Sequence, residues 1–119
     1  MSRYLPLFAA LVTLLAACGS SLCSNELIAD LPSPDHAYVA TVFERNCGAT
    51  TPYVRVVMLR QFDSKFDAER PGDWVSTTEG QPIVEVRWLN NTELEITSTG
   101  GGHAGTRRTQ WNEVRISYK

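Results

Sequence analysis

The chain has 119 residues, of which 11 are basic and 13 acidic, so its formal net charge is −2. This length suffices for one small domain, and so mild an acidic balance lacks the electrostatic footprint of a nucleic-acid-binding protein. The balance also argues against a basic surface that would bind anionic lipid headgroups.

Residues 1–17 have the layout of a secretory signal. One positive charge, Arg3, precedes an apolar run from Tyr4 to Leu15, and two small residues follow it. The run has 12 residues, whereas a helix needs roughly 20 residues to cross a hydrocarbon core of about 30 Å. We therefore expect residues 1–17 to be a signal peptide with a short helix rather than a membrane span.

The segment Leu15-Ala16-Ala17-Cys18 resembles the lipobox of bacterial lipoproteins. The resemblance implies cleavage after residue 17, followed by a thioether-linked diacylglycerol and an amide-linked acyl chain such as palmitate on Cys18. Several acyl chains hold a protein stably on a membrane, where a single chain is marginal. Gly19 follows the cysteine, and in lipoproteins of enteric type the lack of Asp there favours the outer membrane, with the domain facing the periplasm. An ordinary signal peptide with an accidental cysteine is the alternative.

The two remaining cysteines, Cys23 and Cys47, predict a disulfide. They form an even pair in a chain bound for an oxidising compartment, where disulfides persist. The closed loop has 25 residues, for which the chain-entropy model gives about 3.5 kcal/mol of stabilisation. The alternative is a reactive thiol at Cys47, although neither His36 nor His103 lies in a recognisable thiol-protease context. Loss of Arg3 with the signal changes the net charge to −3, with ten basic and thirteen acidic residues left.

We expect residues 18–25 to form the acylated N-terminus and a tether, and residues 26–119 to form a single domain. Small polar residues after Cys18 bury no core and keep backbone freedom, as a tether does. The segment 26–31 fits either a short strand or one helical turn. Pro32-Ser33-Pro34-Asp35 predicts a turn, because proline fixes φ and Ser and Asp favour turns.

The segments 37–45 and 53–61 predict a hairpin. Both are rich in β-branched and aromatic residues, and residues 46–52 form the connection between them. Apolar side chains fall on both faces of 37–45, which is typical of a central strand that is covered on both sides.

Residues 62–73 differ in composition from the β-rich segments before them, since they contain four acidic residues and the pair Pro71-Gly72. Phe62 and Phe66 are spaced for one helical face, so a short helix and a long surface loop both remain open. The acidic residues match no calcium-binding loop pattern, and we expect them to be solvated; they are Asp63, Asp67, Glu69 and Asp73.

Residues 83–97 predict a second hairpin. Val84, Val86 and Trp88 alternate with charged residues, and a two-residue turn at Asn90-Asn91 leads to a second alternating run. Residues 74–75 predict a short edge strand and residues 111–119 a last strand. Five or six strands, little helix and no parallel crossover units indicate an all-β, mainly antiparallel single domain, which is a sheet, a sandwich or an open barrel.

Two further stretches resemble known proteins. The run from Ser33 to Ala40 is similar to the strand entry of the propeller repeats of TolB-like proteins, which usually have glycine at the position of His36, and residues 86–96 are similar to the corresponding segment of a next repeat. The chain length leaves room for two blades at most, which excludes a closed propeller. The run from Ser33 to Thr51 resembles small exported bacterial proteins of unknown function, and this resemblance implies no activity.

The best candidate for a ligand or partner site is the glycine-rich loop 99–105 with His103, followed by Arg107 and Arg108. Glycine lets the backbone approach a ligand closely, and two guanidinium groups suit a carboxylate or a phosphate. The alternative is a mobile hairpin loop flanked by solvated charges. The three consecutive glycines lack both the spacing of a dinucleotide fingerprint and a following helix.

The sequence indicates no catalytic residue, metal or cofactor. There is no Gly-x-Ser-x-Gly elbow around a serine, and the two histidines lack metal-ligand spacing to each other and to the cysteines. The carboxylates Glu85, Glu93 and Glu95 fit the solvated face of a hairpin. Trp74, Trp88 and Trp111 are expected in the core or on a sheet face.

Two hypotheses of function follow. The first is a lipid-anchored envelope module that binds a partner protein or a cell-wall component through an exposed strand edge or the loop 99–108. The second is a periplasmic inhibitor or protective lipoprotein that blocks a hydrolase with a rigid loop. An enzyme is the third and least favoured class, and nucleic acid is not an expected partner.

Overall fold

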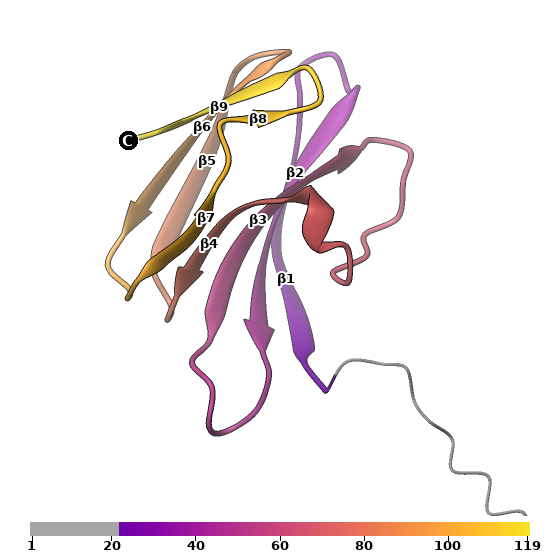
Figure 1. The fold of residues 1–119 in the computed structure, drawn as a ribbon. Helices are drawn as coiled ribbons and strands as arrows, with labels where there is room; N and C mark the ends of the chain where they lie inside the picture. The colour runs from indigo at the N-terminus through magenta and orange to yellow at the C-terminus, as the bar shows by residue number, and fades with distance from the viewer. Residues whose placement is uncertain (1–21) are drawn as a thin grey trace, which may run out of the picture.

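The computed structural model describes residues 22–119, which fold into two β-sheets packed face to face (Figure 1). This confirms the expected all-β, mainly antiparallel single domain, here a sandwich whose nine strands outnumber the five or six predicted. The predicted signal peptide and Cys18 lie outside the described residues. The elements are β1 (Ser24–Pro32), β2 (Tyr38–Asn46), β3 (Val54–Gln61), the 3-10 helix η1 (Pro71–Asp73), β4 (Trp74–Glu79), β5 (Ile83–Asn90), β6 (Glu93–Thr99), β7 (Ala104–Arg107), β8 (Gln110–Trp111) and β9 (Val114–Tyr118).

The first sheet has the strand order β1-β2-β3-β4-β7 and the second β5-β6-β9-β8. Neighbouring strands are antiparallel except β6 and β9, which run parallel. Only residues 108–109 separate β7 from β8, so the chain itself closes the sandwich along this side. On the other side, β1 and β5 are the edge strands, and the indole N–H of Trp88 on β5 donates to the carbonyl of Leu31 on β1 at 2.7 Å.

The main core lies between the sheets and follows from alternation along the strands. Every second residue of β2 and β3 points into it, as do residues of the second sheet, which hides their apolar surface from water. Its buried members are Ala40, Val42, Val57, Leu59, Val75, Leu94, Ile96, Trp111, Val114 and Ile116.

A second, smaller core lies on the outer face of the first sheet. Phe43, Val56 and Met58 point to this face and are buried beneath the segment 62–73, which contributes Ala68 and Phe66. The Phe43 ring contacts those of Phe66 and Trp74 edge to face, at centroid distances of 5.4 and 6.0 Å. The prediction that both faces of 37–45 are covered is therefore confirmed, and the covering element is the long loop.

The structure settles two alternatives along the chain and changes three boundaries. Residues 26–31 belong to the strand β1, which begins at Ser24. Residues 62–70 form a loop without an α-helix. Phe62 and Phe66 do not share one buried face, because Phe62 is exposed while Phe66 packs inward. The turn of the second hairpin lies at 91–92, one residue later than predicted. The predicted strand 111–119 is divided by a turn at 112–113, and part of the predicted loop 99–105 belongs to β7.

The Tyr118 side chain connects the two sheets on the side that residues 108–109 close. Its hydroxyl lies 2.9 Å from the carbonyl oxygen of Val75 in the first sheet and 2.7 Å from that of Arg108. Burial is the main cause that raises the pKa of Tyr118. We expect Tyr118→Phe to lower the free energy of unfolding by about 1–2 kcal/mol, because the carbonyls lose their donor while the packing is kept. Urea unfolding of the variant and the parent measures the difference, and a loss indistinguishable from zero would contradict this role.

Candidate binding cleft

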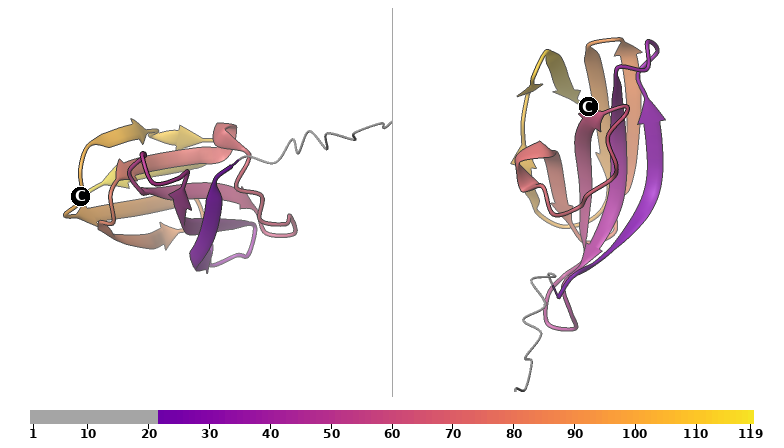
Figure 2. Two further views of the ribbon diagram at one scale, coloured as in Figure 1. Left: turned by 90° about the horizontal axis from the view of Figure 1, so that it is seen from below. Right: turned by 90° about the vertical axis from the view of Figure 1, so that its right-hand side faces the viewer.

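The sandwich has two ends that differ in chemistry. We call the end at which β1 begins the N-terminal end; it carries the connections 47–53, 80–82 and 100–103. We call the opposite end the cleft end; it carries the connections 33–37, 62–73, 91–92 and 112–113. Figure 2 shows β1 running from one end to the other beside β2.

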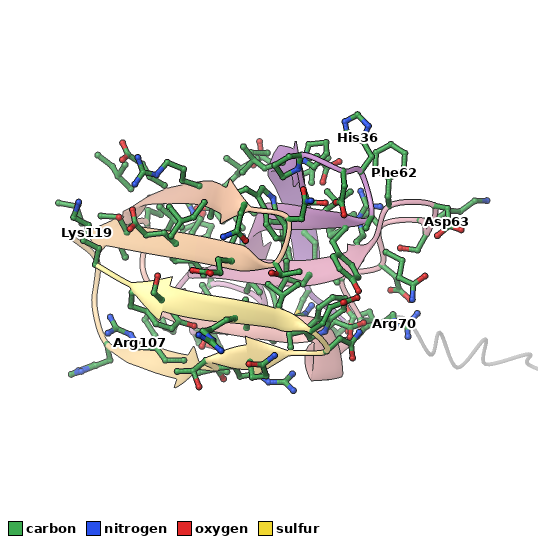
Figure 3. The ribbon with its side chains drawn as sticks, turned by 90° about the horizontal axis from the view of Figure 1, so that it is seen from above. His36, Phe62, Asp63, Arg70, Arg107 and Lys119 are labelled. Carbon is green, nitrogen blue, oxygen red and sulfur yellow. A yellow bond between two sulfur atoms is a disulfide. The ribbon has the colours of Figure 1, made fainter. Side chains whose placement is uncertain are left out.

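A cleft of about 260 Å³ opens at the cleft end, between the loop 62–70 and the turn after β8. Its lining combines charges of both signs with buried apolar side chains. Figure 3 shows Phe62, Asp63 and Arg70 on the same side of this end, whereas Arg107 lies on the other side of the view. The residues that matter for its chemistry are Arg60, Lys65, Arg70, Asp63, Asp67, Asp73, Met58 and Trp111.

Part of this lining is held in place by contacts within the fold. The guanidinium of Arg60 donates to the carbonyl of Ser64 at 2.5 Å and to the hydroxyl of Thr41 at 3.3 Å, and it pairs with Asp30 at 3.3 Å. These bonds tie the loop to three neighbouring strands. Each of the three guanidinium nitrogens of Arg60 has a partner in the fold, so the side chain holds the cleft wall in place.

The opposite wall is fixed by Asp73 at the end of η1. One oxygen of its carboxylate accepts the indole N–H of Trp111 at 3.0 Å, and the other pairs with Arg70 at 3.3 Å. Trp111 belongs to the main core and is 6% exposed. Its polar edge therefore anchors the first sheet's loop to the second sheet at the cleft.

Two charges at the cleft have no partner within the described part of the chain. Asp63 and Lys65 make no hydrogen bond or ion pair with another of residues 22–119, and both are exposed. Asp67, by contrast, accepts the backbone N–H of Glu69 at 3.0 Å. The cleft thus joins a fixed wall to one acidic and one basic group that are available to a ligand.

The turn before β2 completes the cleft end. The N–H of His36 donates to the carbonyl of Ser33 at 2.9 Å, and the φ of His36 is 56°, a value that glycine adopts without strain. The His36 ring stacks on the exposed Phe62, with centroids 5.1 Å apart and planes at 17°.

Ser33, in the same turn, is fully buried and lowers the pKa of the Asp35 carboxyl group. Its hydroxyl donates to the Asp35 carboxylate at 2.8 Å and accepts the N–H of Tyr38 at 3.1 Å. This side-chain hydrogen bond, followed by the N–H of Ala37, lowers the pKa of Asp35 below its ordinary value of 3.8. Because the folded pKa is the lower one, the stabilisation is present above pH 3.8 and is lost as the pH falls through the folded value.

We expect Ser33→Ala to raise the pKa of Asp35 towards 3.8, because its largest cause of depression is removed. NMR titration of the Asp35 carboxyl in the variant and in the parent measures the change. Thr41→Ala is a matched control, because Thr41 is also a fully buried hydroxyl but its hydrogen bond goes to Asp30 at 2.6 Å. An unchanged pKa in Ser33→Ala would show that the backbone alone holds the charge.

The structure distributes the sequence-predicted site residues along β7 rather than around one point. The carbonyl of His103, at the N-terminal end, accepts the N–H of Glu79 at 3.0 Å. The guanidinium of Arg107 lies 5.2 Å from the centre of the Tyr118 ring, and Arg108 donates to the carbonyl of Gly72. The two guanidinium groups therefore contact different parts of the fold.

The remaining predicted residues have structural positions. Cys23 and Cys47 form a disulfide, as predicted, at the N-terminal end. The three tryptophans pack in the two cores, and each indole N–H donates to the protein; the acceptors belong to Ala68, Leu31 and Asp73. Glu95 pairs with Arg87 on the hairpin, while Glu85 and Glu93 are exposed.

No metal or membrane-spanning element is found in residues 22–119. No group of three or more His, Cys, Asp or Glu side chains in this range is arranged to hold a metal ion. The same range contains no helix with the length and hydropathy that a membrane span needs. The lining of the cleft is mainly polar, with Met58 and Trp111 as its apolar members, which suits the binding of a polar partner.

Sequence reasoning missed this cleft because its walls come from distant segments. Asp73 and Trp111 are 38 residues apart, and nothing in their local sequence predicts that they meet. The one available signal was Phe66 in the acidic stretch 62–73, because an aromatic side chain among charged residues needs an apolar surface to pack on. Comparison of the chain with models of protein families, with curated proteins and with solved structures finds no match.

Proposed function

We propose that this protein is a lipid-anchored binding module of the bacterial cell envelope, which holds a partner protein or a cell-wall component in the cleft. The anchor is the acylated Cys18 that the lipobox resemblance implies, and the membrane is the outer one, with the domain on its periplasmic side. The observation that supports binding at the cleft is the pair of uncommitted charges, Asp63 and Lys65, beside a wall fixed by Arg60 and Asp73.

The cleft favours a partner that carries both signs of charge. Asp63 offers a carboxylate to an ammonium or guanidinium group, and Lys65 offers an ammonium to a carboxylate. Opposite charges two residues apart also set the orientation of such a partner, since the reversed arrangement brings like charges together. Peptides of the cell wall and charged loops of envelope proteins have this chemistry.

The cleft is a better candidate than the free edge of β1. The β1–β2 register shifts between Leu27 and Ala29, so a bulge at Ile28 interrupts the edge. Bulges twist an edge strand and hinder the addition of a further strand from a partner. The exposed side chains of Leu27 and Ile28 lie at this bulge.

Photocrosslinking in living cells tests the proposal. A photoreactive amino acid at position 62, next to the uncommitted pair, is expected to capture a partner in the parent and to lose it in Asp63→Ala/Lys65→Ala. The matched control is Glu85→Ala/Arg87→Ala, which also removes one acid and one base two residues apart, but on the outer face of β5. Neither double variant changes the net charge.

Capture that survives the cleft variant and is lost in the control would contradict binding at the cleft. Arg107→Ala tests the glycine-rich loop separately, because Arg107 lies over Tyr118 rather than in the cleft. Mass spectrometry of the captured species distinguishes a protein from a cell-wall fragment. If that species is a hydrolase whose activity the purified protein abolishes, the inhibitor hypothesis replaces the simple binding module.

A further inference from the structure

The connections at the N-terminal end contain almost no charge. Residues 47–53, 80–82 and 100–103 include no Asp, Glu, Lys or Arg, and His103 is their one side chain that can carry a positive charge. The connections at the cleft end, by contrast, contain six acidic and three basic residues when the connection 108–109 is included, because Arg108 donates to the carbonyl of Gly72. These residues are Asp35, Asp63, Asp67, Glu69, Asp73, Glu113, Lys65, Arg70 and Arg108. Charge is therefore sorted between the two ends of one small domain.

Exposed apolar side chains stand at the same uncharged end. Leu22 is almost fully exposed, Ile83 is 66% exposed and Tyr53 is 42% exposed. They come from the segment before β1, the start of β5 and the residue before β3. The N–H of Gly80 donates to the carbonyl of Tyr53, and the Cys23–Cys47 disulfide joins the segment before β1 to the connection 47–53. Two exposed carboxylates lie on the strands that reach this end, Glu26 on β1 and Glu79 on β4.

The charged groups inside this end neutralise each other. Arg55 pairs with Glu44 at 3.1 Å, and the side-chain amide of Gln81 in the uncharged connection donates to the same Glu44 oxygen at 2.8 Å. The bond from Gln81 is the largest cause that lowers the pKa of Glu44. The pair thus contributes no net charge to the surface above it.

The position of Cys18 brings this end towards lipid. Four peptide units join Cys18 to Leu22, so their Cα atoms are separated by at most about 15 Å. The nine residues of β1, at about 3.3 Å each, extend roughly 30 Å towards the cleft end. An acyl chain on Cys18 therefore holds the N-terminal end near the membrane and leaves the cleft end out of reach unless the domain lies flat.

We propose that the N-terminal end of the sandwich is a membrane-facing surface, which rests on the lipid headgroups around the acylated Cys18 with Tyr53 and Ile83 against them. This inference depends on the lipid anchor of the proposed function. Tyrosine suits the boundary between headgroups and hydrocarbon because its ring is apolar and its hydroxyl is polar. A surface without carboxylates on its connections also loses little hydration on contact with lipid.

Electrostatics select the same orientation. The cleft end has three more acidic than basic residues in its connections, and bacterial membranes contain anionic lipids that repel it. Repulsion of this kind acts within a Debye length of about 8 Å at physiological ionic strength. The domain therefore contacts the membrane with its N-terminal end, and the cleft faces the periplasm.

Fluorescence quenching by brominated lipids tests this orientation. The full chain is produced in bacterial cells and reconstituted in vesicles of phosphatidylethanolamine and phosphatidylglycerol, with and without bromine on the acyl chains. Tyr53→Trp places a reporter at the N-terminal end, and Phe62→Trp places its matched control at the cleft end, because the two native side chains are 42% and 46% exposed. The parent corrects for the three native tryptophans.

The emission added by Tyr53→Trp is expected to be lost in brominated vesicles, while that added by Phe62→Trp is kept. Equal quenching of both reporters means that the domain lies flat, and absence of quenching at position 53 means that this end does not touch lipid; either result overturns the inference. Flotation of the parent with the vesicles and its mass report the anchor separately. A protein that floats without quenching at 53 keeps the proposed function, whereas a protein that carries no acyl group and does not float overturns both.

Discussion

Cys23→Ala/Cys47→Ala is expected to lower the free energy of unfolding by about 3.5 kcal/mol, the value that the chain-entropy model gives for a closed loop of 25 residues. The disulfide joins the residue before β1 to the first residue after β2, so the closed loop contains both strands and their turn. Without the bond, the unfolded chain gains the freedom of that loop while the native pairing of the strands is unchanged. Urea unfolding followed by circular dichroism measures the difference.

The same change has a local signature. β1 pairs with β2 alone, and across the sandwich it accepts the hydrogen bond from Trp88 and packs Ala29 and Leu31 against the main core. We therefore expect the backbone amides of β1 to exchange with solvent faster than those of β2 and β3 in the double variant. Reduction of the parent is the control and is expected to give the same midpoint. A loss below about 1 kcal/mol would mean that the unfolded chain is already restrained.

The two hairpins could be predicted because their signals are local. Val84, Val86 and Trp88 alternate with charged residues on β5, and the observed burial follows this alternation. The double-sided apolar pattern of 37–45 likewise predicted a strand with both faces covered. In each case the alternation of apolar and polar side chains lies within one run of consecutive residues, so the strand can be predicted without knowing its distant partners.

The strand β7, at the edge of the first sheet, and the parallel pairing of β9 in the second sheet could not be predicted in the same way. β7, with the sequence Ala-Gly-Thr-Arg, is exposed throughout and is a strand because its backbone pairs with β4. β9 lies parallel to β6, a pairing that joins Glu93 to Arg115 across the segment containing β7 and β8. The exposed residues of β7 show no periodicity that predicts a strand. The alternation within 111–119 did predict a strand there, and only the parallel pairing of β9 with β6 depends on distant residues.

The cleft could not be predicted from the sequence for a related reason. The acidic residues of 62–73 were expected to be solvated, and Asp63 does remain without a partner among the described residues. Asp73, however, accepts the Trp111 indole, and Arg60 bonds the loop at Ser64. Some charged side chains of a polar loop bond to the fold and others stay free. The position of the folded loop decides which, and the composition of the loop does not predict that position.

Phe43→Ala is expected to lower the free energy of unfolding by about 3–5 kcal/mol, the range typical of a large aromatic side chain removed from a core. Phe43 is fully buried in the second core, where its ring contacts Phe66 from the loop and Trp74 at the start of β4. Its loss leaves a cavity between the first sheet and the loop that forms one wall of the cleft. The expected damage is therefore greatest on the outer face of that sheet.

A double-mutant cycle with Phe66→Ala isolates the contact that docks the loop. Phe66 is partly buried, so its single substitution is expected to cost less than that of Phe43. The edge-to-face contact of the two rings predicts a coupling of about 0.5–1.5 kcal/mol. Additive losses would mean that the two rings stabilise the fold independently.

Leu94→Ala is the matched control, because Leu94 is also fully buried but lies in the main core, on β6. Both variants are expected to lose several kcal/mol on the scale of large core truncations, yet they should differ in where the native state opens. In Phe43→Ala, amide exchange is expected to rise in 62–70 and capture at the cleft to weaken even when the protein is fully folded. In Leu94→Ala, the loop should keep its protection. Equal exchange of the loop in the two variants would mean that Arg60 and Asp73, rather than the second core, hold the cleft wall in place.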